Sequence, residues 1–112
     1  MAKKVLLVCS STMVDLLRAA CQRAHAEVLI AGTLAEAAHM LMQSPDLVVW
    51  ELMLPDGDAR PLIQATRNAK PLLEMVGVSG DTDERLMQFG AGCNRTSGPF
   101  HAITLVAEIL SS

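Results

Sequence analysis

The sequence predicts a single α/β domain in which a five-stranded parallel sheet is covered by helices on both faces. Short apolar runs alternate with stretches whose apolar residues recur at helical spacing, and this unit returns about every 22 residues. The alternation is typical of right-handed strand–helix–strand crossovers and therefore of a parallel sheet. The length of 112 residues and the 51% share of hydrophobic residues suit one domain with one well-filled interior.

The first half of the chain is expected to form three strands and two helices. The strands are the apolar runs at residues 5–8, 27–30 and 46–50. Their lack of polar alternation is typical of strands that are buried on both faces. Thr12 with Asp15, and Thr33 with Glu36, have the spacing of capping boxes and predict where the two helices begin. Pro45 is expected to end the second helix before the third strand.

The second half is expected to form two strands and three helices. The strand candidates are residues 72–78 and the weaker stretch 93–96, and the helix candidates are residues 59–68, 81–89 and 99–110. Asp81 with Glu84 can cap the helix that they begin, and Pro99 suits the first turn of the last helix. The residues of the last helix that are expected to face the core are Phe100, Ile103, Val106, Ile109 and Leu110.

Composition and charge exclude several classes of function. The formal charge is −3 and the aromatic residues are one Trp and two Phe, so neither a basic nucleic-acid surface nor a stacking platform is expected. Cys9, Cys21 and Cys93 form no close pair and no His–Cys cluster, which indicates neither a disulfide framework nor a zinc site. The apolar runs are too short for a signal sequence or a membrane span, and we expect a cytoplasmic protein.

Candidate functional residues are sought where the strands end, because ligands of open parallel sheets bind beyond the carboxyl ends of the strands. Small, polar or acidic residues follow every expected strand. These strand-end residues are 9–11, 32–33, 51–58, 79–81 and 97–98.

At these positions the sequence resembles the receiver domains of two-component response regulators, which have the CheY-like, flavodoxin-like fold. The strongest part is residues 46–58, where the ending LPDGD matches the turn that follows the phosphoacceptor strand in this family. Supporting segments are residues 4–8, 76–79 and 90–100. The resemblance covers nearly the whole chain. It implies the strand order 2-1-3-4-5 and one receiver-like domain over residues 1–112.

The sequence departs from this family at the residues that carry its chemistry. Receivers hold Mg²⁺ with two adjacent acidic residues after the first strand, and here Cys9, Ser10 and Ser11 occupy that place. Glu51 stands where the family has the phosphoacceptor Asp, and Gly98 stands where it has a Lys before Pro.

Two further family positions complete the comparison. The hydroxyl residue after the fourth strand is kept as Ser79, whereas Asn94 or Arg95 falls at a position that is aromatic in receivers. The degenerate phosphoacceptor pocket implied by the resemblance comprises Cys9, Ser10, Ser11, Glu51, Ser79 and Gly98.

These losses predict a domain that signals without the phosphorylation cycle of the family. Mg²⁺ prefers carboxylate oxygens, and phosphoryl transfer depends on neutralising charge at the transferring oxygens. With one carboxylate left in the pocket and the Lys missing, we expect no bound metal, no cofactor, no catalytic residue and no enzyme activity. Two interpretations of Glu51 stay open: a fixed negative charge that imitates the phosphorylated state, or a relic side chain that points to solvent.

The main alternative is a phosphoryl carrier or enzyme that uses Cys9 at the end of the first strand. The start KVLLVC also looks like phosphotransferase-system IIB domains, which phosphorylate a Cys there. However, the following residues lack the glycines of a phosphate-binding loop, and Asp15 stands where low-molecular-weight tyrosine phosphatases have Arg. A flavin site would lack aromatic residues to stack on the ring. A third alternative is a structural module from a larger regulator.

The expected action is therefore contact with a signalling protein of unknown identity, with neither nucleic acid nor membrane as partner. By analogy with receivers, the interaction face lies over the fourth helix, the fifth strand and the last helix. Its residues are expected to be Leu86, Gln88, Arg95, Thr104, Leu105, Ala107, Glu108 and Ile109. At least one of Leu105 and Ile109 should be partly exposed, and a homodimer could form there. The alternative is scattered surface hydrophobes without a partner.

Overall fold

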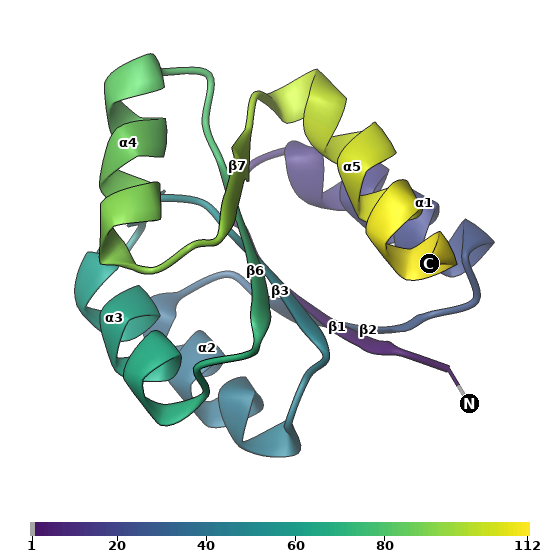
Figure 1. Ribbon diagram of the computed structural model, residues 1–112, viewed down its shortest axis with the longest axis horizontal. Helices are drawn as coiled ribbons and strands as arrows, with labels where there is room; N and C mark the ends of the chain where they lie inside the picture. Colours follow the sequence, from purple (N-terminus) through teal and green to yellow (C-terminus); the bar gives the residue numbers. More distant parts are fainter. Residues whose placement is uncertain (1) are drawn as a thin grey trace.

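Strands and helices alternate along the chain in the computed structural model, which describes residues 2–112 (Figure 1). The strands are β1 (Lys4–Val8), β2 (Glu27–Ala31), β3 (Leu47–Trp50), β4 (Met53–Leu54), β5 (Gly57–Asp58), β6 (Glu74–Val78) and β7 (Arg95–Ser97). The helices are α1 (Met13–Arg23), α2 (Leu34–Met40), α3 (Arg60–Ala69), α4 (Thr82–Ala91) and α5 (Pro99–Ser111), and a 3₁₀ turn, η1 (Leu41–Gln43), follows α2. The expected alternation is confirmed.

The central sheet has the order β2-β1-β3-β6-β7, and all its neighbouring strands are parallel. Counted within this sheet, the order is the expected 2-1-3-4-5. Val8 at the end of β1 lies beside Ala31 and Trp50, and Trp50 lies beside Gly77. The carboxyl ends of the strands therefore lie at one edge of the sheet. The short strands β4 and β5 form a separate antiparallel pair in the loop after β3.

Helices cover both faces of the sheet, with α1 and α5 on one face and α2, α3 and α4 on the other (Figure 1). Alternate residues of β1 enter the two cores: Val5 and Leu7 pack with α1 and α5, whereas Leu6 and Val8 pack on the opposite side. Burial of all four residues explains why the run in the sequence is continuously apolar. Trp50 is fully buried, as expected, in the core under α2 and α3.

The helix beginnings agree with the sequence signals in two of three cases. Thr33 Oγ1 accepts a hydrogen bond from the N–H of Glu36 at 3.1 Å, and Asp81 Oδ1 accepts one from the N–H of Asp83 at 2.8 Å. The prediction for α1 is wrong, because Thr12 has helical backbone angles and makes no cap bond. Ser11 Oγ accepts the N–H of Met13 instead.

Two predictions about apolar side chains are also wrong. Phe100 is 84% exposed, although its spacing placed it in the core, because Ala102 and Val106 are the residues of α5 that face the sheet. The helical spacing of Met42 and Met87 also predicts core positions, but both side chains lie on the surface.

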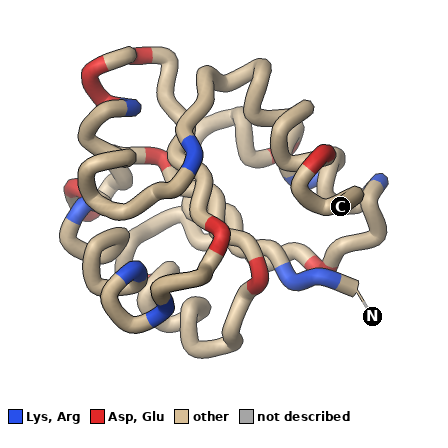
Figure 2. Tube along the Cα trace, viewed as in Figure 1, with Lys and Arg blue, Asp and Glu red and all other residues tan. Residues whose placement is uncertain are grey.

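Charge is spread over the molecule, and Figure 2 shows acidic and basic residues interspersed along the trace. This distribution agrees with the small formal charge of −3. Among residues 2–112, no helix has both the length and the apolar character needed to cross a membrane.

Candidate functional site at the carboxyl edge of the sheet

A shallow cleft of about 250 Å³ lies at the carboxyl edge, where β1, β3 and β6 end. It is lined by Ser11, Met13, Glu51, Leu52, Met53, Val78, Ser79, Gly80, Glu84 and Pro99. Three members of the predicted pocket, Ser11, Glu51 and Ser79, therefore lie along one cleft. The fold thus brings these strand-end residues together as the topology of a parallel sheet requires.

The side chain of Glu51 joins β3 to the loop between β1 and α1. Its Oε1 accepts the backbone N–H of Ser10 at 2.6 Å and that of Ser11 at 3.3 Å. The backbone N–H of Glu51 in turn donates to Val8 at 2.9 Å. The expected partners were hydroxyl groups or backbone N–H groups, and the backbone supplies both bonds. Because the carboxylate is held by two N–H donors, Glu51 is not a side chain that simply points to solvent.

Ser79 takes part in a different set of hydrogen bonds. Its hydroxyl donates to Glu84 Oε1 at 2.6 Å and accepts the backbone N–H of Asp81 at 3.0 Å. Among residues 2–112, no hydrogen bond joins Ser79 to Glu51. The hydroxyl is therefore committed to α4, and the two polar residues of the pocket act on different neighbours.

Arg85 occupies the space next to Gly98, where the resemblance places a Lys. A Cβ built on Gly98 would lie 4.0 Å from Arg85 Nη1. The guanidinium donates to the carbonyl of Ser79 at 2.6 Å and to Thr82 Oγ1 at 3.0 Å. Sequence reasoning named Glu84 only as a capping partner of Asp81 and missed Arg85, because it examined strand ends and both residues lie in the first turn of α4. The signal available was the acidic cap at Asp81, which places the next turn of α4 beside the strand ends.

The loop after β3 is fixed by two carboxylates. Asp56 accepts the N–H groups of Leu34 and Ala35 at 2.8 and 3.1 Å, so it caps α2, although its place in the turn before α3 predicts a cap on α3. These backbone hydrogen bonds hold the pKa of Asp56 below its usual value. Asp58 does cap α3 through the N–H of Arg60, and the hydrogen bond from the Arg60 guanidinium lowers the pKa of Asp58.

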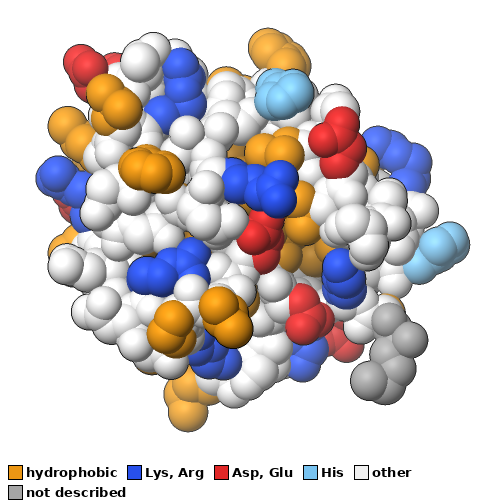
Figure 3. Space-filling view, in the orientation of Figure 1, with side chains coloured by type: hydrophobic (Ala, Val, Ile, Leu, Met, Phe, Trp, Pro, Cys, Tyr) orange, Lys and Arg blue, Asp and Glu red, His pale blue; other side chains and the backbone are white. Residues whose placement is uncertain are grey.

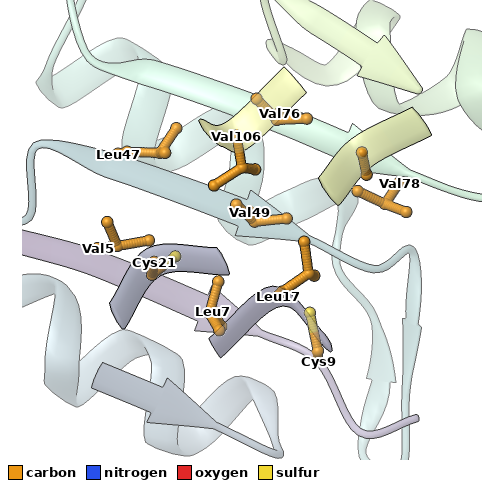
Figure 4. Close-up of a cluster of buried hydrophobic side chains, with 11 residues drawn as sticks. Val5, Leu7, Cys9, Leu17, Cys21, Leu47, Val49, Val76, Val78 and Val106 are labelled. Carbon is orange, nitrogen blue, oxygen red and sulfur yellow. The ribbon is translucent and has the colours of Figure 1, made fainter. Parts of the chain in front are cut away.

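Cys9 is buried and does not face the cleft. Its side chain lies among the apolar residues of β1 and α1, next to Leu17 (Figure 4). Burial, and then the negative charge of Glu51, raise the pKa of the Cys9 thiol far above its usual value. Burial also raises the pKa of Cys21 to about 11 and that of Cys93 to about 12. A thiol that is held protonated is a weak nucleophile, which disfavours the alternative built on Cys9.

The donors in this cleft do not fit the Mg²⁺ ion that the resemblance implies. Ser10 and Ser11 present N–H groups toward Glu51, and these groups already hold its Oε1. Mg²⁺ requires several oxygen ligands in octahedral array. Within the described part of the chain, no three His, Cys, Asp or Glu side chains gather as a metal site would require.

The surface over α4, β7 and α5 carries most of the residues that were expected to form an interaction face. Arg95 and Glu108 are exposed, and Leu105 and Ile109 are half-buried against the core, as the spacing in the last helix indicated. Leu86 is 64% exposed and Phe89 is 61% exposed. Figure 3 shows hydrophobic side chains standing out over α4. We name Leu86, Phe89, Arg95, Leu105, Glu108 and Ile109 the α4–α5 face.

The structure corrects the position of Gln88 and shows where the side chains of Asn94 and Arg95 lie. Gln88 was expected on the face but is fully buried beneath α4. Of the two candidates for the aromatic position, Asn94 is exposed, and its Oδ1 accepts the N–H of Met75 at 2.7 Å. Arg95 turns outward and forms an ion pair with Glu74 at 2.8 Å.

Solved structures of response regulator receiver domains have the same architecture as this chain. A CheY-like response regulator receiver domain from Methanospirillum hungatei JF-1 superposes with a TM-score of 0.83 at 20% identity, over 99% of this chain and 95% of that one. The chain has the fold of a response regulator receiver domain. The Mn²⁺-bound form of the response regulator Rcp1 gives a TM-score of 0.77 at 20% identity, over 97% of this chain and 92% of that one.

A further solved structure shares the fold. The beryllofluoride-activated NtrC4 receiver domain, a dimer, gives a TM-score of 0.75 at 19% identity, over 96% of this chain and 98% of that one. No protein-family model matches the chain, and no curated protein matches it. The likeness therefore establishes the fold, and the resemblance noted in the sequence agrees with it.

Proposed function

We propose that the chain is a cytoplasmic pseudo-receiver, a domain with the receiver fold that signals by protein contact without Mg²⁺-dependent phosphorylation of an Asp. The observation that carries the proposal is the Glu51 carboxylate, which is bound directly to the N–H groups of Ser10 and Ser11. A side chain held in this way keeps the β1–α1 loop attached to β3 without a metal.

The length of the Glu51 side chain supports this proposal. Rcp1 has been solved with Mn²⁺, and receivers in general use a divalent ion between the first-strand loop and the acceptor Asp. In this chain the longer Glu51 side chain spans the distance to the loop by itself. We name this direct bond between Glu51 and the loop N–H groups the Glu51 clasp. Ser79 and Arg85 are bound to each other, and the Ser79 hydroxyl is bound to Glu84 of α4, so these hydrogen bonds hold both residues in place beside the cleft.

The proposal also supplies a surface for the partner. The α4–α5 face combines apolar side chains with Arg95 and Glu108, a mixture that suits a small protein–protein contact. The activated receiver of NtrC4 is a dimer, and a second copy of this chain is one partner that such a face could bind. In this function the face is presented without a phosphorylation step.

The first experiment tests the absence of phosphorylation chemistry. Trp50 is the single Trp of the chain and immediately precedes Glu51, so Mg²⁺ is titrated at millimolar concentrations while Trp fluorescence is followed. We expect no saturable change in the wild type and none in Glu51→Gln. Intact mass after incubation with acetyl phosphate should show no added phosphoryl group.

Three results would count against the proposal. A saturable Mg²⁺ response that is lost in Glu51→Gln would show a metal site. A hydroxylamine-labile phosphoryl adduct on Glu51 would show that the acceptor chemistry survives. An adduct on Cys9 would favour the carrier alternative instead.

The second experiment tests the face with a matched pair of variants. Leu86→Glu places a charge on the α4–α5 face, and Leu72→Glu places the same charge on an even more exposed leucine outside that face. We expect Leu86→Glu alone to reduce self-association in sedimentation, or to release the bound proteins that the wild type captures. If both variants keep every contact while the circular dichroism spectrum is native, the face is not the interface.

A further inference from the structure

A fully buried glutamine connects α4 to the ends of two strands. Gln88 has no exposed surface, and its Nε2 donates to the carbonyl of Trp50 at 3.2 Å and to that of Val78 at 3.2 Å. These carbonyls belong to the last residues of β3 and β6. One side-chain amide therefore bridges two neighbouring strands from the helix above them.

The sequence makes room for this amide at one position. A Cβ on Gly77 would lie 2.7 Å from Gln88 Cβ and 2.7 Å from its Oε1. Real Cβ atoms do not approach so closely, so α4 can pack against β6 at this distance because residue 77 is Gly. Gly77 lies beside Trp50 in the sheet, and the two positions together form the floor on which Gln88 rests.

The side-chain oxygen of Gln88 is buried without a hydrogen-bond donor in the described structure. Among the described residues, Gln88 Oε1 has no hydrogen-bond partner, and burying such a group without a partner costs stability. A smaller apolar residue would avoid that cost. In return, the amide forms two directional hydrogen bonds from α4 to fixed carbonyls of β3 and β6, which an apolar side chain could not form.

The position of the bridge connects the cleft with the exposed face. Trp50 and Val78 immediately precede Glu51 and Ser79, which line the cleft. Leu86 and Phe89, which lie two residues before and one residue after Gln88, are exposed to solvent. The amide thus lies between the two surfaces on which the proposed function depends.

We propose that Gln88 is a positioning residue that holds α4 in one place on the sheet, and so holds the α4–α5 face in its binding position. The proposal rests on the proposed function for the identity of that face, but the fixing of α4 can be tested without any partner. It predicts that Gln88 contributes more to the immobility of α4 than to the stability of the rest of the fold.

The test is amide hydrogen exchange in wild type, in Gln88→Met, which keeps the length of the side chain, and in the control Gln64→Met at an exposed position of α3. Loss of two hydrogen bonds is expected to speed exchange in α4 about 30-fold in Gln88→Met, and exchange in α1 much less. In the wild type, the α4 amides should be protected as well as those of α1 and α5.

The outcomes separate this proposal from the proposed function. Equal acceleration of exchange in α1 and α4 would overturn the positioning role, since Gln88 would then serve general stability. Weak protection of α4 in the wild type would overturn it even if Gln88→Met does not fold. If α4 loosens as expected but binding at the face is unchanged, the positioning role stands and the proposed face is wrong.

Discussion

Replacing Glu51 with Asp removes one methylene from the side chain that fastens the β1–α1 loop. The carboxylate then withdraws by about 1.5 Å, the length of one carbon–carbon bond. The present distances from Oε1 to the N–H groups of Ser10 and Ser11 are 2.6 and 3.3 Å. After withdrawal neither group is within hydrogen-bond range unless the loop moves. The substitution therefore opens the Glu51 clasp while it retains the charge.

The expected loss of stability follows from these two bonds. Hydrogen bonds to charged groups are worth about 1.5–3 kcal/mol each. Because Glu51 is partly exposed, solvent screening reduces the contribution of each bond to the lower end of that range or below it. The bond to Ser10 is short and the bond to Ser11 is near the limit, so we expect a total of about 1.5–2 kcal/mol. For a domain of this size the melting temperature should fall by about 6–8 °C.

Urea unfolding followed by Trp50 fluorescence measures the loss, and Glu108→Asp serves as the control. Glu108 is an exposed helix residue, so the same shortening there should change the free energy of unfolding by less than about 0.5 kcal/mol. Amide exchange at Ser10 and Ser11 should become faster in Glu51→Asp alone. Unchanged stability together with unchanged exchange at these two amides would refute the clasp.

Three other outcomes are expected. Gly77→Ala should destabilise the fold by about 1–3 kcal/mol in the same urea assay, because the new Cβ collides with Gln88; wild-type stability would show that α4 can shift freely. At pH 7 a thiol-alkylating reagent should modify the three buried Cys only after unfolding in urea, whereas rapid native labelling of Cys9 would revive the carrier alternative. Because the pKa of Asp56 is lower in the folded state than its usual 3.8, its stabilisation is present above that pH and is lost as the pH falls further. Asp56→Asn should flatten this acid part of the stability curve, and an unchanged curve would exclude the cap on α2 as its source.

The strands of the sheet could be predicted because each one is marked by a short apolar run in the sequence. Continuous apolar runs such as Val5 to Val8 are buried on both faces, and the resemblance supplied the order of the strands. The last helix was harder, since nearly every residue between Ala102 and Leu110 is apolar or small. Periodicity then fixes the inward side poorly, which explains why Phe100 was placed in the core.

The site could be predicted by position but not by its contacts. The sequence placed Glu51, Ser11 and Ser79 at one edge, and the cleft joins them. It could not show that Glu51 binds backbone N–H groups, because almost every residue type has such a group and the sequence does not mark which ones bind. Gln88 was placed on the surface by analogy with the interaction face of receivers, which does not test the burial of a single residue. Its burial depends on Gly77, a residue eleven positions earlier in the chain that lacks a Cβ.

The Glu51 clasp also limits which substitutions the chain can accept one at a time. Ser10→Asp alone would bring a second carboxylate toward Glu51 with no cation to compensate the repulsion. Glu51→Asp alone would detach the loop before any metal site exists to hold it. A Lys at position 98 alone would place a second positive charge near the guanidinium of Arg85, whose Nη1 lies 4.0 Å from the new Cβ. Each single step toward the receiver residues is therefore unfavourable by itself, and a laboratory lineage selected for phosphorylation would need these changes together.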